Sequence, residues 1–133
     1  MNRYKLREHT FKLLFLAEFY REEERAEQIQ LYFEREELEG AGQDARNLVI
    51  AKYENVLEQV EVIDNRINTV ASNWKTDRMG KVDLSILRLA VYEMDYDDGV
   101  PTGVAINEAV ELGKKYGQDE SPAFINGILA KLC

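Results

Sequence analysis

The stretch Leu84-Ser-Ile-Leu-Arg-Leu-Ala-Val-Tyr-Glu-Met94 has apolar residues at eight of its eleven positions. A helix on the surface of a globular protein needs apolar residues on only one face. A helix that is hydrophobic on nearly every side is instead buried among its neighbours. We therefore expect residues 84–94 to form a central helix that several other helices pack against.

Apolar residues also recur at helical spacings on both sides of this segment. The predicted helices cover residues 4–19, 22–38, two stretches within 44–74, then 84–94, 102–116 and 121–132. Gly40-Ala41-Gly42 ends the second of them, and the two helices within 44–74 join near residue 60, with Trp74 as their last apolar position. No segment has the pattern of a strand, so the predicted fold class is all-α with about seven helices.

The chain has 133 residues, which is the size of one domain and leaves room for two packed subdomains. Its longest apolar runs are far shorter than the roughly 20 residues that a membrane span requires. The N-terminal segment is amphipathic, with scattered basic residues, and does not have the pattern of a secretory leader. We therefore expect a cytoplasmic protein that does not contact a membrane.

The formal net charge is −8, but the basic residues gather at the N-terminal end, where residues 1–21 contain five Lys or Arg and only two Glu. A positive patch on an acidic body can bind nucleic acid locally, although such a patch can also be a solvated helix face. For RNA, the candidate phosphate contacts are Arg3, Lys5, Arg7 and Lys12. The aromatic candidates for holding unpaired bases are Phe15 and Phe124, unless these rings belong to the core.

The side chains that catalysis and metal binding require are scarce. His9 is the only histidine, expected on a partly exposed helix face, and Cys133 is the only cysteine. A Cys/His nucleophile, a zinc site and a disulfide framework therefore have no support. Carboxylate pairs such as Glu108 and Glu111 have the spacing of a solvated helix face. We expect a protein that interacts with other molecules and has no catalytic residue, metal or cofactor.

Several long blocks of the sequence resemble the NusB family of transcription antitermination proteins. These blocks are Ile86-Leu-Arg-Leu-Ala-Val-Tyr-Glu-Met94, Val100-Pro101, Ala105-Ile-Asn-Glu-Ala-Val-Glu-Leu112, Lys114-Lys-Tyr-Gly117 and Phe124-Ile-Asn-Gly-Ile-Leu-Ala-Lys131. They cover about residues 80–132. A weaker match at Arg7-Glu8, with the aromatic-rich segment after it, extends the resemblance to nearly the whole chain.

The resemblance implies one all-helical domain of two small bundles, with subdomains at about residues 1–59 and 60–133. It also implies a non-catalytic adaptor that binds the boxA element of ribosomal RNA transcripts together with the ribosomal protein NusE. The pair then acts on elongating RNA polymerase. In relatives a basic N-terminus helps to bind RNA, and the positions that match it here are Arg3, Lys5 and Arg7.

The resemblance further places Glu120, with Asp119 beside it, and Phe124 in a segment near the bound RNA. This sequence departs from the family pattern at its N-terminal end, where Tyr4 and Leu6 interrupt the basic run. Phe15 also stands where many relatives have tyrosine. Both departures remove polar groups that would face RNA, so we expect weak RNA binding by the chain alone and a strong dependence on NusE.

Two further functions fit the same residues. One is an RNA-recognition module of the NusB type that serves an RNA cytosine methyltransferase, although 133 residues leave no room for a domain that binds the methyl donor. The other is a protein-only role, in which an apolar stripe of the bundle is buried in a homodimer or against a partner. Removal of the basic N-terminal residues would abolish RNA binding but leave a protein-only function intact.

Two glycines predict close helix packing. Gly113 and Gly127 both lie inside predicted helices, where glycine costs about 1 kcal/mol relative to alanine. Such a cost suggests that another helix approaches the backbone at each site. Asn126, beside Gly127, is expected to hydrogen-bond the backbone of a neighbouring helix or loop, with direct contact to RNA as the alternative.

Overall fold

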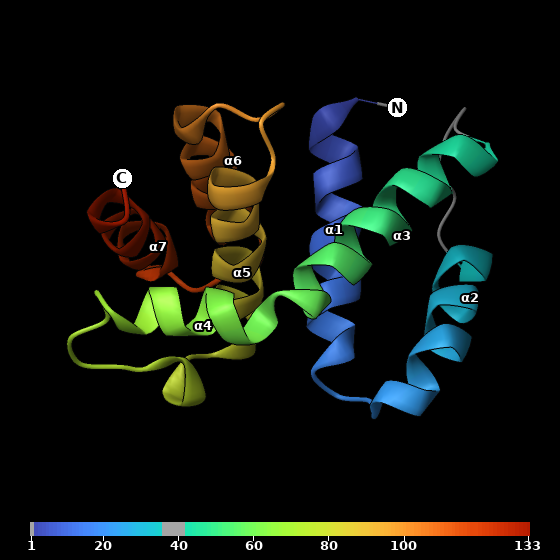
Figure 1. Cartoon of the computed structure of the whole chain (residues 1–133), viewed down its shortest axis with the longest axis horizontal. Coiled ribbons are helices and arrows are strands. Elements are labelled where there is room, and N and C mark those ends of the chain that lie inside the picture. The colour runs from blue at the N-terminus through green and yellow to red at the C-terminus, as the bar shows by residue number, and fades with distance from the viewer. Residues whose placement is uncertain (1, 36–41) are drawn as a thin grey trace. The chain divides into compact units, whose positions relative to one another are not determined.

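The computed structural model of the chain describes residues 2–35 and 42–133, and these residues contain seven α-helices and no strand (Figure 1). The α-helices are α1 (Arg3–Ala17), α2 (Arg25–Arg35), α3 (Gln43–Glu58), α4 (Val60–Asn68), α5 (Lys81–Tyr96), α6 (Thr102–Tyr116) and α7 (Ser121–Lys131). Two short 3-10 helices, η1 (Glu22–Glu24) and η2 (Thr76–Arg78), precede α2 and α5. The predicted all-α fold class is confirmed. Gly40 and Ala41, expected to help end the second helix, lie outside the described residues.

The chain divides into two compact units, unit 1 (Met1–Leu57) and unit 2 (Glu58–Cys133). Unit 1 contains α1, α2 and nearly all of α3, whereas unit 2 contains α4 to α7. The resemblance implies a subdomain boundary between residues 59 and 60, and that boundary stays a prediction.

Helix α5 is the centre of unit 2, because it packs against α4, α6 and α7. Figure 1 shows α5 and α6 side by side. The buried side chains of α5 include Leu84, Ile86, Leu87, Leu89, Ala90 and Val91, each no more than 2% exposed. The expectation of a central helix over residues 84–94 is therefore confirmed.

Ion pairs tie α4 to α5 at the edge of this apolar core. The Arg88 guanidinium donates to both carboxylate oxygens of Asp64, at 2.9 and 2.8 Å. The Arg66 guanidinium donates to Asp95 at 2.6 Å and to the carbonyl oxygen of Leu132 at 2.8 Å. Arg66 thereby joins α4 to α5 and to the residue that follows α7.

The two glycines at which close packing was predicted, Gly113 and Gly127, have opposite surroundings. A Cβ at Gly113 would lie 2.9 Å from Cδ1 of Ile125 and 3.5 Å from the backbone nitrogen of Pro122, so the predicted close approach of α7 is confirmed there. A Cβ at Gly127 would meet no atom within 4 Å. Asn126 is exposed as well. The close approach predicted at Gly127 is therefore wrong, because no neighbouring element comes within contact distance of the backbone there, and the exposed Asn126 side chain makes no hydrogen bond with a described residue, so that prediction is wrong as well.

Unit 1 buries polar side chains as well as apolar ones. Four consecutive residues of α1, from Arg7 to Thr10, are at most 6% exposed. His9 was expected on a partly exposed face, but it is buried and its Nδ1 is hydrogen-bonded to the hydroxyl of Tyr32 in α2. Tyr32 in turn packs its edge against Phe33. The correction has a physical reason, since a tyrosine hydroxyl lets an imidazole be buried without losing its hydrogen bond.

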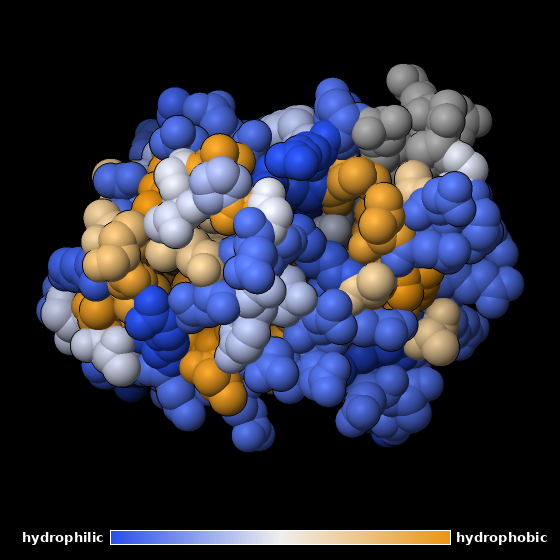
Figure 2. Space-filling view, turned by 45° about the horizontal axis from the view of Figure 1, so that its top comes forward, coloured by the Kyte–Doolittle hydropathy of each residue, from blue (hydrophilic) through white to orange (hydrophobic). Residues whose placement is uncertain are grey.

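Two aromatic residues that the spacing placed inside predicted helices lie beyond the ends of the observed helices. Helix α1 ends at Ala17, and Phe19 follows it with 59% of its surface exposed. Helix α4 ends at Asn68, and Trp74 lies in the loop before η2 with 54% exposed. The face of the molecule in Figure 2 is largely hydrophilic, with smaller hydrophobic areas between the polar side chains. Within the described residues no helix is long and apolar enough to cross a membrane.

Candidate RNA interface

The first turn of α1 presents two of the predicted phosphate contacts. The side-chain oxygen of Asn2 accepts a hydrogen bond from the backbone N–H of Lys5 at 2.8 Å and so caps the helix. Arg3 and Lys5 are both exposed, and no acidic residue lies in this turn. Cations at a helix N-terminus oppose the macrodipole, so this arrangement disfavours the isolated helix and favours the binding of an anion.

The two cations differ in how available they are. Arg3 makes no hydrogen bond or ion pair with any other described residue. The ammonium of Lys5 lies 3.4 Å from a carboxylate oxygen of Glu8, although half of its side chain stays exposed. Glu8 itself is buried, so Lys5 is the solvent-facing member of this pair, and the exposed part of its side chain is accessible to a phosphate.

The other two predicted phosphate contacts lie deeper. Arg7 is 6% exposed, and Lys12 is half-buried. Burial of a guanidinium restricts its access to a ligand and holds its position firmly. The roles predicted for Arg7 and Lys12 stay predictions, and the exposed cations of α1 that the structure offers directly are Arg3 and Lys5.

Phe15 belongs to a row of three aromatic rings on unit 1. Its centroid lies 6.5 Å from that of Phe11 and 5.1 Å from that of Phe19, with which it makes an edge-to-face contact. Phe11 is buried, Phe15 is half-buried and Phe19 is mostly exposed. Phe19 therefore offers more ring surface to a base than Phe15 does. Phe19 is not among the predicted site residues because its spacing matched the apolar face of the preceding helix.

In unit 2 the turn between α6 and α7 positions Glu120. The backbone N–H of Gln118 donates to the hydroxyl of buried Ser121 at 2.9 Å, which closes the turn. A Cβ at Gly117 would lie 2.5 Å from the Ser121 side chain, so only glycine fits there. Glu120 follows in the turn as an exposed residue whose side chain makes no cap hydrogen bond.

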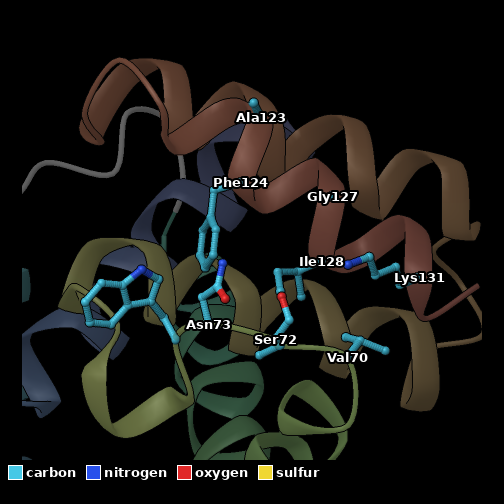
Figure 3. A pocket seen from close by; sticks show the side chains of 10 residues that line it. Val70, Ser72, Asn73, Ala123, Phe124, Gly127, Ile128 and Lys131 are labelled. Carbon is cyan, nitrogen blue, oxygen red and sulfur yellow. The ribbon is translucent and has the colours of Figure 1, made fainter.

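Phe124 lies one helical turn beyond Glu120, and its N–H donates to the Glu120 carbonyl oxygen at 3.0 Å. Its half-buried ring lines a pocket of about 220 Å³. The opposite wall of this pocket is the loop of residues 70–74 (Figure 3). The structure therefore brings together Glu120 and Phe124 in unit 2, whereas in unit 1 Arg3 and Lys5 lie in the first turn of α1 and Phe15 lies near its other end.

The loop wall of this pocket contains residues that are not among the predicted RNA-binding residues. Ser72, Asn73 and Trp74 line the pocket opposite Phe124. The one available signal was Trp74, the only tryptophan of the chain, which helical spacing assigned to a buried face. Across residues 2–35 and 42–133, no group of three or more His, Cys, Asp or Glu side chains is arranged to hold a metal ion.

An all-helical fold with exposed cations on one helix and aromatic rings beside polar groups has the features of a nucleic-acid-binding protein. Comparison with known proteins identifies the family within this class of nucleic-acid-binding proteins. Residues 4–133 match the NusB family, so the chain belongs to that family. A relative from Agathobacter rectalis, "Transcription antitermination protein NusB", is 49% identical over 131 residues, which are 98% of each protein.

Solved structures agree with this assignment of the fold. A structure of T. maritima NusB matches with a TM-score of 0.85 and 32% identity, over 99% of this chain and 90% of the other. A structure of the antitermination factors NusB and NusE in complex with double-stranded RNA matches with a TM-score of 0.78. The match covers 99% of this chain and 97% of the other at 24% identity, so it shows a shared fold.

Proposed function

We propose that this chain is a transcription antitermination adaptor. It binds boxA-type single-stranded RNA of ribosomal RNA transcripts together with the ribosomal protein NusE, and the assembly acts on elongating RNA polymerase. The observation that carries the proposal is the family match over residues 4–133, with relatives named as transcription antitermination proteins. A protein of the same fold was crystallised with NusE and RNA. The chain acts in the cytoplasm and catalyses no reaction.

The contacts with RNA divide between backbone and bases. Arg3 and Lys5 bind phosphates, because they are the exposed cations at the start of α1. Phe15 and Phe124 hold unpaired bases through their exposed edges. Glu120 accepts hydrogen bonds from base amino groups, since a carboxylate near phosphates is otherwise repulsive. With so few cations the chain binds RNA weakly alone and depends on NusE.

The test is the salt dependence of RNA binding. A fluorescently labelled boxA-type RNA is titrated with the protein and NusE at several salt concentrations, and binding is followed by anisotropy. Each phosphate contact to single-stranded RNA contributes about 0.7 to the slope of log affinity against log salt. The double variant Arg3→Gln/Lys5→Gln should therefore flatten the slope by about 1.4 and weaken binding about 25-fold near 0.1 M salt.

A matched control separates these contacts from the effect of net charge. The double variant Arg35→Gln/Lys114→Gln removes the same charge from exposed positions of α2 and α6. It should keep the wild-type slope and bind within about twofold of the wild type. Equal slopes for both double variants would remove Arg3 and Lys5 from the interface. A scrambled RNA bound as well as the boxA-type RNA, with NusE present, would refute the proposed function.

A further inference from the structure

The pocket of unit 2 has two walls of different origin. One wall is the loop between α4 and η2, with Ser72, Asn73 and Trp74, and the other is the outer face of α7, with Phe124, Gly127 and Lys131. Figure 3 shows the Phe124 ring pointing from α7 toward Asn73. The pocket volume of about 220 Å³ is smaller than that of a typical drug-binding site and suits a single flat ring system.

Hydrogen bonds on the side of the loop away from the pocket hold the loop wall in place. Nζ of Lys75 donates to the carbonyl oxygens of Asn68 and Ala71, at 2.9 and 2.7 Å. The backbone N–H of Thr76 donates to the side-chain oxygen of Asn68 at 2.9 Å. These bonds close the loop onto the end of α4, so the residues between Ala71 and Lys75 are presented on a fixed support.

The polar groups that face the pocket are unused within the protein. The side chains of Ser72, Asn73 and Lys131 make no hydrogen bond or ion pair with any other described residue. Lys75 and Thr76, the next residues along the chain, both use their polar groups in the loop. A hydroxyl, an amide and an ammonium therefore surround an aromatic pocket with their hydrogen-bonding capacity free.

Gly127 is an independent sign that something outside the chain occupies this space. Glycine inside a helix lowers stability relative to alanine, and a Cβ at Gly127 would meet no atom within 4 Å. The fold thus gives no reason for glycine at this position, in contrast to Gly113, where Ile125 fills the space. A bare backbone here leaves room for a ligand that lies against α7.

We propose that this pocket binds one unpaired nucleobase of single-stranded RNA, with the base stacked on the Trp74 indole. The amide of Asn73 and the hydroxyl of Ser72 bond the base edge, and Lys131 binds the adjoining phosphate. The inference rests on the proposed function, because Phe124 belongs both to the candidate RNA interface and to this pocket. Aromatic stacking with free amide and ammonium groups is the chemistry by which proteins hold unpaired bases.

Trp74 is the only tryptophan, so its fluorescence reports on this pocket alone. The full chain is titrated with the boxA-type RNA in the presence of a tryptophan-free NusE variant, and tryptophan emission is recorded. Affinity is measured in parallel by anisotropy of the labelled RNA. We expect saturable quenching of Trp74 at the RNA concentrations that raise the anisotropy. Trp74→Ala and Asn73→Ala should each weaken the affinity about tenfold.

Matched variants test the same site without removing a ring. Gly127→Leu fills the pocket, whereas Gly103→Leu adds the same side chain to α6 at a position where a Cβ also meets no atom within 4 Å. Lys131→Ala is compared with Lys114→Ala, which removes an exposed lysine of α6. Gly127→Leu and Lys131→Ala should weaken RNA binding, while the two controls should not. Circular dichroism checks that each variant keeps the helical content of the wild type.

The outcomes separate this inference from the proposed function. RNA binding without quenching, and with wild-type affinity in Trp74→Ala and Gly127→Leu, would overturn the nucleobase pocket and leave the adaptor function standing. Quenching by NusE alone, unchanged when RNA is added, would identify the pocket as a protein contact and also overturn the inference. Absence of any RNA binding by the wild type with NusE would refute both proposals.

Discussion

Helices α1 and α5 have 15 and 16 residues, and each buries a run of consecutive residues, but with different chemistry. The run in α5 is Leu84–Leu87, which is apolar except for one serine, whereas the run in α1 is Arg7–Phe11, whose first four residues are polar. Apolar burial is non-directional, while each buried polar group needs a partner in a particular place. An apolar pattern therefore predicts where a helix lies, whereas a charge pattern does not predict which residues are exposed.

The largest expected effect on stability comes from a substitution in the apolar core around α5. Leu87 of α5 is 0% exposed, and Leu87→Ala should lower the free energy of unfolding by about 3 kcal/mol, through lost burial and the cavity it leaves. Urea denaturation followed by circular dichroism measures this loss. Leu48→Ala, at a position 61% exposed on α3, should change stability by less than about 0.5 kcal/mol. Similar losses for both variants would contradict the central place of α5.

A smaller effect is expected from the polar interior of unit 1. Tyr32→Phe removes the hydroxyl that is hydrogen-bonded to Nδ1 of His9 and leaves a buried imidazole nitrogen without this bond. The expected loss of unfolding free energy is about 1 to 2 kcal/mol. Tyr96→Phe, at an exposed tyrosine of α5, is the control and should be nearly neutral. Equal stability of the two variants would show that the polar interior does not depend on this bond.

The smallest effect is confined to alkaline pH. Burial raises the pKa of the Tyr53 hydroxyl above its ordinary value of 10.0, the Arg25 charge opposes this rise, and the Glu54 charge adds to it. Above about pH 10 the unfolded chain loses this proton before the folded chain does, so stability falls as pH rises toward the folded pKa.

Tyr53→Phe removes this contribution. The wild type should therefore lose more unfolding free energy than Tyr53→Phe between about pH 8 and about pH 11. The exposed control Tyr96→Phe should keep the wild-type loss. Urea denaturation at the two pH values measures the difference, and parallel losses in wild type and Tyr53→Phe would contradict the raised pKa.

Much of the fold was predictable because apolar side chains have a single preference. The central position of α5 follows from its apolar residues, and the close approach at Gly113 follows from the cost of glycine in a helix. Gly127 carries the same sequence signal but faces open space, since a helix-interior glycine indicates a cost and does not reveal its cause. Phe19 and Trp74 were misplaced because an exposed aromatic residue beyond a helix end can match the spacing of a buried one.

The candidate site was less predictable because its parts come from distant segments. Basic residues at the start of the chain identified Arg3 and Lys5, but the burial of Arg7 depends on tertiary packing that charge patterns do not encode. The loop with Asn73 meets α7 only in the folded unit, and no local spacing joins these two segments. The resemblance to the NusB family identified Phe124 as a candidate, whereas the residues of the opposite pocket wall were identified only in the structure.

The packing order of unit 2 has a consequence for how the chain folds during synthesis. Helix α5 packs on α4 and α6, and α6 packs on α7, so most packed neighbours follow one another along the chain. Contacts between segments close in sequence require only short loops to form, and helical bundles of this kind fold in about microseconds to milliseconds. A ribosome needs several seconds to make residues 58–133 at about 5–20 residues per second. Each helix of unit 2 can therefore find its neighbour while the following helix is still being translated.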